Sequence, residues 1–205
     1  MANENITDNL HYERLLKEKG FNLVCGIDEA GRGPLAGPVC AAAVIMPDGF
    51  VIDGVTDSKK LSPKKRDMLF DMIKENAVSY SIAYASVEEI EEINILNATM
   101  LAMRRACDGL EIKPDFAIID GNKTPELSCP SYSIVKGDSL SHSIAAASIL
   151  AKVSRDRLIE QMAKEYPEYE FEKHKGYGTK LHIEMIRKYG PSPVHRMSFL
   201  KKILK

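Results

Sequence analysis

Asp28 and Glu29 stand side by side at the end of an apolar run, and Ala30-Gly31-Arg32-Gly33-Pro34 follows at once. The run before them, residues 21–27 (FNLVCGI), is typical of a buried β-strand. A carboxylate at the tip of such a strand is partly removed from water, which is costly for a charge without a partner. Two adjacent acids there indicate a bound cation, and the glycines beyond them allow a backbone to approach a ligand closely.

The size and composition of the chain predict one globular domain, with 205 residues, 44% hydrophobic and 28% charged. The start lacks the basic and apolar regions of a secretory signal, and no apolar run is long enough to cross a membrane. The cysteines form no C-x-x-C pair, which favours reduced thiols. We therefore expect a cytoplasmic protein without membrane contact, and a monomer meets every requirement of the sequence.

Strand-like and helix-like segments alternate along the chain. Apolar runs predict strands at residues 21–27, 39–46, 80–85, 116–120 and 132–135. Helices are predicted at residues 63–77, from 86 toward 109, at 144–166 and at 179–189. Ser62 and Ser86 occupy the N-cap positions of two of them. This alternation predicts an α/β layer fold with one sheet.

Carboxylates end three of the predicted strands. Asp28 and Glu29 end the first, Asp120 ends residues 116–120, and Asp138 comes shortly after residues 132–135. Ligands of open α/β sheets bind at strand ends, so we expect these acids to share a site. Successive strand side chains point to opposite faces, so Glu29 should lie past the regular strand with its side chain bent back. Clustered carboxylates repel one another without cations, and all-oxygen ligation favours Mg²⁺ or Mn²⁺.

Eight short blocks of sequence follow one another in a characteristic order. They are residues 26–38 (GIDEAGRGPLAGP), 57–61 (DSKKL), 94–103 (NILNATMLAM), 119–122 (IDGN), 135–138 (VKGD), 145–156 (AAASILAKVSRD), 174–177 (HKGY) and 195–199 (HRMSF). Together they resemble the motifs of bacterial ribonuclease HII over about residues 24–199, nearly the whole chain. Each block is moderately specific, and their common order is highly specific.

The resemblance implies a ribonuclease H-like mixed sheet flanked by helices, with a small helical C-terminal extension. It divides the chain into an N-terminal extension (residues 1–20), a catalytic domain (21–190) and a basic tail (191–205). It implies an endonuclease that hydrolyses the RNA strand of RNA/DNA hybrids and cuts 5′ to single ribonucleotides in duplex DNA, leaving 5′-phosphate and 3′-hydroxyl ends. Asp28, Glu29, Asp120 and Asp138 match its catalytic metal ligands, and two ions about 3.5–4 Å apart would activate water and stabilise the leaving oxygen.

Contacts to the substrate are expected from residues outside the acid cluster. An enzyme that cuts at a ribonucleotide must detect the 2′-hydroxyl, and the backbone of Gly31-Arg32-Gly33 is bare enough to reach it. The resemblance assigns Gly31, Arg32 and Gly33 this role and implies that Tyr177 packs against the neighbouring sugar. Ser58 and Lys59 are further candidate substrate contacts.

Other polar residues near these motifs are expected to be structural. Asp156 follows the block at residues 145–156, and we predict a helix-surface or supporting role rather than a fifth metal ligand. The histidines share no ligand spacing, so structural hydrogen bonding is predicted for each of them: His142, His174, His182 and His195.

Several alternatives fit parts of the sequence. Ribonuclease HIII is a close relative, but it carries an N-terminal platform domain and typically Gly-Lys-Gly, whereas Arg32 is present here and about twenty residues precede the first strand. Four-acid exonucleases space their acids differently. A non-catalytic nucleic-acid-binding module would use residues 173–205, with nine Lys/Arg and one acid, but leaves the strand-end acids unexplained. A dinucleotide-phosphate loop would need glycines one residue closer together.

Overall fold

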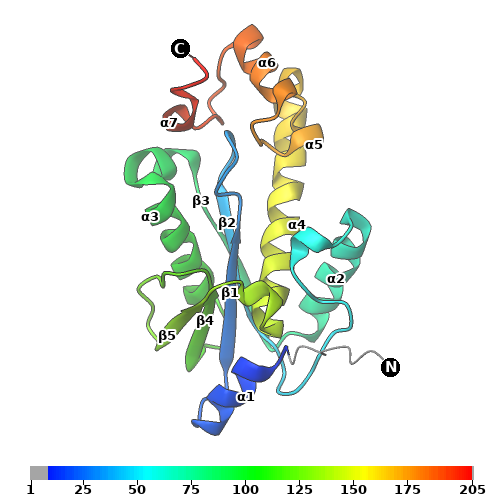
Figure 1. Cartoon of the computed structure of the whole chain (residues 1–205), viewed down its shortest axis with the longest axis vertical. Coiled ribbons are helices and arrows are strands. Elements are labelled where there is room, and N and C mark those ends of the chain that lie inside the picture. Colours follow the sequence, from blue (N-terminus) through cyan, green and yellow to red (C-terminus); the bar gives the residue numbers. More distant parts are fainter. Residues whose placement is uncertain (1–8, 205) are drawn as a thin grey trace, which may run out of the picture.

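The computed structural model describes residues 9–204 of the chain. Its five strands form one mixed sheet in the order β3-β2-β1-β4-β5 (Figure 1). The strands are β1 (Val24–Ala30), β2 (Val39–Ile45), β3 (Ser79–Ala85), β4 (Phe116–Asp120) and β5 (Ser131–Ile134). β1 is antiparallel to β2 and parallel to β4, so it joins the two halves of the sheet. The expected α/β fold with a mixed sheet flanked by helices is confirmed.

Helices cover both faces of this sheet. They are α1 (His11–Glu18), α2 (Pro63–Asn76), α3 (Val87–Asp108), α4 (His142–Glu165), α5 (Phe171–His174), α6 (Lys180–Tyr189) and α7 (Met197–Leu200). In Figure 1, α3 lies on one side of the sheet, and α2 and α4 lie on the other. Val39, Ala41 and Ala43 of β2 belong to the core under α3, whereas the alternate residues Cys40 and Ala42 belong to the core under α4. Burial on both faces explains why β2 is apolar throughout.

Several predicted boundaries are correct, and the errors have local causes. The Ser62 and Ser86 hydroxyls accept hydrogen bonds from backbone N–H groups of the first turns of α2 and α3, as predicted. β1 begins at Val24 instead of residue 21 and continues to Ala30, because β2 pairs with it that far. α3 has a kink at Asn94, whose φ is 66° and whose side chain caps the second half of the helix.

The packing of α4 against β1 depends on Gly26. A Cβ at this position would overlap the backbone of Ser143 and Ile144 in the first turn of α4. The absence of a side chain therefore lets the helix lie directly on the central strand. Ala146 and Ala147, which follow in α4, are small and fully buried, so the close contact continues along the helix.

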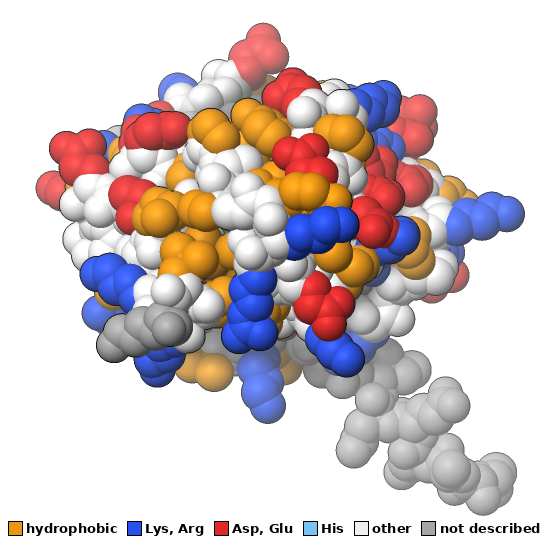
Figure 2. All heavy atoms as spheres, turned by 90° about the horizontal axis from the view of Figure 1, so that it is seen from above, with side chains coloured by type: hydrophobic (Ala, Val, Ile, Leu, Met, Phe, Trp, Pro, Cys, Tyr) orange, Lys and Arg blue, Asp and Glu red, His pale blue; other side chains and the backbone are white. Residues whose placement is uncertain are grey.

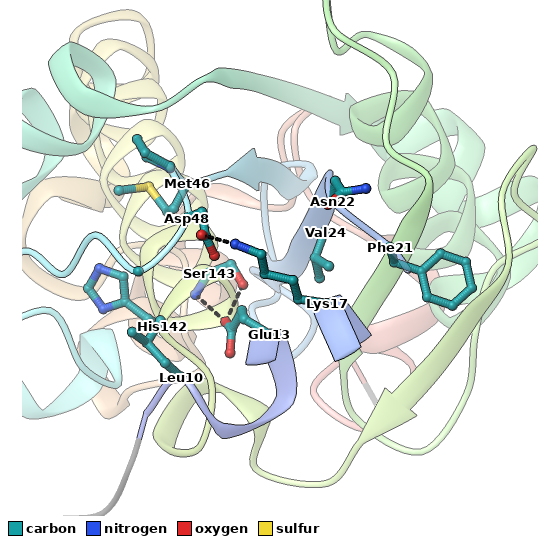
Figure 3. A pocket seen from close by; sticks show the side chains of 12 residues that line it. Leu10, Glu13, Lys17, Phe21, Asn22, Val24, Met46, Asp48, His142 and Ser143 are labelled. Atoms are coloured by element: carbon teal, nitrogen blue, oxygen red, sulfur yellow. Dashed lines mark hydrogen bonds and ion pairs between the residues drawn. The ribbon is translucent and has the colours of Figure 1, made fainter. Parts of the chain in front are cut away.

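The N-terminal extension contributes to this packing. α1, for which the sequence predicts no element, places the Glu13 carboxylate at the N-terminus of α4 (Figure 3). Glu13 accepts hydrogen bonds from the Ser141 hydroxyl at 2.6 Å and from the Ser143 backbone N–H at 3.1 Å. Lys17 forms an ion pair with Asp48. The carboxylate thus caps N–H groups at the positive end of the α4 dipole.

All four cysteines are free thiols, as expected, and Cys25, Cys40 and Cys107 are buried. Across residues 9–204, the structure has no helix with the length and apolar character needed to cross a membrane. The start of the chain, where the sequence predicts no secretory signal, lies outside the described residues.

Gly26→Ala should destabilise the protein by about 3 kcal/mol or more, because the methyl group has to displace helix backbone rather than a flexible side chain. Chemical denaturation followed by circular dichroism measures the change. Gly49→Ala is the matched control, since a Cβ there has nothing within 4 Å and the only cost is that of the left-handed φ of 67°, roughly 1–2 kcal/mol. Equal losses in the two variants would show that the close α4–β1 contact is not required.

Candidate active site

Three carboxylates meet at the ends of neighbouring elements. Asp28 lies near the end of β1, Asp120 ends β4, and Asp138 lies in a short 3₁₀ turn (Gly137–Ser139) after β5. Ile27 pairs with Ile119 in parallel register, so Asp28 and Asp120 follow at the same level of adjacent strands. One carboxylate oxygen from each acid lies within 4.8 Å of the other two. The structure thus brings together three of the four acids that the sequence predicts for one site.

Glu29 is placed differently from the expectation. It pairs with Ala41 of β2, so it lies inside β1 rather than past the end of the strand. Its carboxylate accepts a hydrogen bond from the Arg32 guanidinium at 3.2 Å and is not one of the three that meet. Glu29 still acts on the cluster, because its backbone N–H donates to Asp28 Oδ1 at 2.7 Å. It lies at the edge of the cluster and lines the adjoining pocket.

The electrostatics of the cluster favour a bound cation. Burial raises the pKa of Asp28 well above its usual range, and the charges of Glu29 and Asp120 raise it further. The pKa of Asp138 is also raised, first by burial and then by the charge of Asp120. Closely spaced carboxylate oxygens are the ligands that Mg²⁺ and Mn²⁺ prefer, so these residues fit a divalent metal.

Lys59 supplies a positive charge beside the cluster. Its Nζ lies 3.8 Å from Asp138 Oδ2, and 77% of its side chain is exposed. Partial burial lowers the pKa of Lys59, but the charges of Asp28 and Asp138 outweigh this effect and raise it overall. The neighbouring Ser58 is buried, and its hydroxyl lies 2.8 Å from that of Ser148 on α4. Lys59 is therefore accessible to a ligand, whereas Ser58 belongs to the wall behind it.

A pocket of about 400 Å³ adjoins the acids. Its lining contains all six residues predicted to contact substrate, together with Glu29. The lining residues are Glu29, Ala30, Gly31, Arg32, Gly33, Ser58, Lys59, Arg66, Ser148, Lys152 and Tyr177. The sequence did not single out Arg66, whose guanidinium donates to the backbone oxygens of Ser58 and Leu61 and so holds the turn that carries Lys59. It also missed Ser148, which hydrogen-bonds to Asp28 and opposes the rise in the pKa of that acid.

The glycine loop exposes its backbone to this pocket. Gly31 has a φ of 97°, and a Cβ there would overlap the Arg155 side chain. A Cβ on Gly33 would lie 3.8 Å from the Tyr177 ring, which is 44% exposed. Gly33 is exposed and therefore leaves its backbone unshielded beside an accessible aromatic ring, whereas Gly31 is buried.

Two buried arginines hold this loop, and neither was predicted to do so. Both Arg196 and Arg155 are nearly inaccessible, and no ion pair to either is present within residues 9–204. The Arg196 guanidinium donates to the backbone oxygens of Gly31, Arg32, Pro34 and Gly37 at 2.7–3.0 Å. That of Arg155 donates to the backbone oxygens of Ala36, Pro38 and Lys175. Burial lowers the pKa of Arg196 to about 9, so it still carries its charge at neutral pH.

The basic C-terminal segment, residues 173–205, does not form a continuous positive face. Figure 2 looks onto the end of the molecule that carries α5, α6 and α7, and it shows Lys and Arg side chains interspersed with acidic and apolar ones. Lys173, Lys175 and Lys180 each form an ion pair with a glutamate. Asp156 is likewise paired with Lys152 on the surface of α4, as expected for a residue outside the metal site.

Known proteins resemble this chain over nearly its whole length. A family model described as "Ribonuclease HII" matches residues 25–202. A ribonuclease HII from Caldicellulosiruptor saccharolyticus is 58% identical over 193 residues, which is 94% of each chain. One from Clostridioides difficile (strain 630) is 54% identical over 98% of this chain and 76% of the relative.

Solved structures agree with these similarities. The crystal structure of ribonuclease H2 from Pyrococcus horikoshii OT3 superposes with a TM-score of 0.73 at 29% identity, over 88% of this chain and 96% of that one. The structure titled "Bst-RNase HIII in complex with Mn2+" has a TM-score of 0.73 at 19% identity, over 89% and 69% of the two chains. At that identity the likeness shows the fold alone.

Asp28→Asn should stabilise the metal-free protein, because it removes a charge that burial and two neighbouring acids disfavour. The melting temperature in chelator should rise by about 2–4 °C, the equivalent of about 1 kcal/mol in a domain of this size. The folded-state pKa of Asp28 is raised, so the wild type loses stability as the pH rises through that pKa. The advantage of the variant should therefore shrink as the pH falls.

Millimolar Mn²⁺ should raise the melting temperature of the wild type and have little effect on Asp28→Asn. A ligand at a hundred times its Kd stabilises the folded state by about 2.7 kcal/mol. Differential scanning fluorimetry measures both shifts. The same Mn²⁺ shift in both proteins would place the metal elsewhere.

Proposed function

The chain belongs to the ribonuclease HII family, enzymes that hydrolyse the RNA of RNA/DNA hybrids, and we propose that it also cuts 5′ to single ribonucleotides embedded in duplex DNA. The observation that carries this proposal is the meeting of Asp28, Asp120 and Asp138 next to a loop with an unshielded backbone. Cleavage chemistry and ribose recognition would then take place side by side.

Asp28, Glu29, Asp120 and Asp138 are the residues that would hold two divalent ions, Mg²⁺ or Mn²⁺. Such ions, when bound, activate water and stabilise the leaving oxygen of a phosphodiester, which gives 5′-phosphate and 3′-hydroxyl ends. Asp28 would be the central acid of this set, because it is 3% exposed and lies next to Glu29 in β1 and at the level of Asp120 in β4. Its orientation is supported by hydrogen bonds from the Glu29 backbone N–H and from Ser148.

Selection of the ribonucleotide is proposed to depend on the glycine loop and Tyr177. A 2′-hydroxyl both donates and accepts, so the backbone groups of the exposed Gly33 can bind it directly. The backbone oxygens of Gly31 and Arg32 accept from Arg196 and so hold the loop in place. The exposed Tyr177 ring lies beside Gly33 and can pack against the adjacent sugar. Lys59 and Arg32 are half-exposed or more and can reach the backbone phosphates. Ser58 would contribute as a wall of the pocket.

The alternatives explain fewer observations. A ribonuclease HIII-type enzyme shares the fold, but the high identities are to ribonuclease HII sequences. A non-catalytic binding module would not require three carboxylates within 4.8 Å of one another in a buried setting. We further propose that the protein acts as a monomer, since the acids and the pocket are complete within one chain. We propose the cytoplasm as its location, because all four cysteines are free thiols, as is usual in a reducing compartment.

Asp120→Asn should lower cleavage by at least about a thousandfold, because an amide cannot supply the negative charge that a catalytic metal needs. The fold should persist, since the Asn oxygen can still accept the hydrogen bond that Gly137 N–H donates to Asp120 Oδ1 at 2.7 Å. The assay is cleavage of a closed circular duplex with one ribonucleotide, with and without chelator. Asp71→Asn on the exposed surface of α2 is the control and should cleave at the wild-type rate. Normal turnover in Asp120→Asn would refute the metal site.

Tyr177→Ala should lower kcat/KM on the single-ribonucleotide duplex by about 10- to 100-fold, since stacking on a nucleotide contributes roughly 1–3 kcal/mol. The loss should be smaller on a long RNA/DNA hybrid, and the melting temperature should change little because the ring is 44% exposed. An equal loss on both substrates would reject the role of Tyr177 at the junction.

A further inference from the structure

Three histidines are buried directly beneath the Tyr177 loop. His174 ends α5, His182 lies in α6, and His195 precedes Arg196; none is more than 7% exposed. The His174 and His182 rings are stacked, with centroids 4.2 Å apart. Phe171 packs edge-on against His182, which places the rings in an apolar layer.

The hydrogen bonds of these histidines determine where each proton lies. Ser192 N–H donates to His195 Nδ1 at 3.0 Å, so the proton of neutral His195 is on Nε2. His195 Nε2 is 3.0 Å from His182 Nε2, which must therefore accept. The proton of His182 is then on Nδ1, which donates to the Tyr177 backbone oxygen at 3.0 Å. The chain of donors has a single consistent direction, from Ser192 to Tyr177.

Burial keeps these rings neutral. The pKa of both His182 and His195 is lowered to about 4, mainly by burial, and the nearby charge of His174 contributes to the decrease. A protonated His182 would point an N–H at the N–H of His195. The series of hydrogen bonds from Ser192 through His195 and His182 to Tyr177 therefore exists only when both imidazoles are neutral.

The Tyr177 ring gains little orientation from core packing, because it is 44% exposed. Its direction depends on the backbone that carries it. Tyr177 N–H donates to the His174 oxygen at 2.9 Å, and the Tyr177 oxygen accepts from Thr179 N–H and from His182. The contact from His182 is the side-chain hydrogen bond to Tyr177 itself, while Leu35 N–H donates to the neighbouring Gly176 oxygen at 2.8 Å.

We propose that His182, oriented by His195, is a positioning residue that holds the Tyr177 backbone so that the ring meets the sugar at a ribonucleotide junction. This inference rests on the proposed role of Tyr177. It also connects the two substrate-contacting segments, since His195 pairs with Ala36 of the glycine loop and Arg196 holds that loop. His195 and Arg196 would thus help to set the distance between the Tyr177 ring and the loop proposed to bind the 2′-hydroxyl.

Two substitutions separate the contacts of His182. In His182→Asn, the amide nitrogen can replace Nδ1 as donor to Tyr177, whereas the contact to His195 is lost. In His182→Gln, the longer amide can replace Nε2 as acceptor from His195, whereas the contact to Tyr177 is lost. Each variant loses one buried hydrogen bond, so similar decreases in melting temperature are expected.

The measurement is the ratio of kcat/KM on the single-ribonucleotide duplex to kcat/KM on a long hybrid. His182→Gln should lower this ratio by about tenfold, the effect of one misplaced hydrogen-bonded contact. His182→Asn should keep the ratio within about twofold of the wild type. Equal ratios in the two variants, whether lowered or unchanged, would overturn the proposal and leave His182 with a purely structural role.

Tyr177→Ala, measured in parallel, distinguishes a failure of the proposed role of Tyr177 from a failure of the positioning role of His182. If it lowers the ratio and His182→Gln does not, only the positioning role fails. If it leaves the ratio unchanged, the proposed function of Tyr177 fails and the positioning role with it. Imidazole ¹⁵N NMR of the wild type at pH 7 should show His182 protonated on Nδ1 and His195 on Nε2. The opposite tautomer on either ring would also overturn the proposal, without any need for a variant to fold.

Discussion

The close packing of α4 on the central strand is the contact on which the rest of the site depends. It exists because Gly26 has no side chain where the backbone of Ser143 and Ile144 passes. From that point the 24-residue helix carries successive supports to the site. Ser148 hydrogen-bonds to Asp28, and Arg155 binds the backbone of the glycine loop. At the N-terminal end of α4, Glu13 of α1 caps the first turn of the helix. A rigid helix seated on β1 therefore sets the distance between the acids and the loop.

The loops around the pocket are held by buried polar side chains rather than by apolar packing. The guanidinium of Arg196 binds four backbone oxygens, and Arg155 binds three. A buried charge without a carboxylate is costly unless its donors are satisfied, and carbonyl oxygens satisfy them here. Such an arrangement fixes the course of a glycine-rich loop without covering it. Gly33 thus stays exposed, whereas Gly31 is buried and its backbone oxygen accepts from Arg196.

The charge distribution explains how a protein with a net charge of −1 can act on a polyanion. Of the nine Lys/Arg in residues 173–205, Lys173, Lys175 and Lys180 are each paired with a glutamate and Arg196 is buried on backbone oxygens, which reduces the contribution of these four to a general attraction for nucleic acid. Affinity would depend on a few local cations, such as Lys59 next to Asp138, and on metal held by the acids. A bound divalent ion would relieve the mutual repulsion of these closely spaced carboxylates.

Much of the fold and of the acid cluster was predictable from the sequence, because those features depend on short-range chemistry. Apolar runs predicted the strands, Ser62 and Ser86 the helix starts, and strand-end acids the meeting of Asp28, Asp120 and Asp138. Glu29 was misplaced because the length of β1 is decided by pairing with β2, which no local pattern encodes. Structural hydrogen bonding was predicted for His182 and His195, but their partners, and the role of Arg196, were decided by tertiary structure alone. Their partners lie up to 165 residues away, and side-chain type does not reveal which distant carbonyl or imidazole completes a buried hydrogen bond.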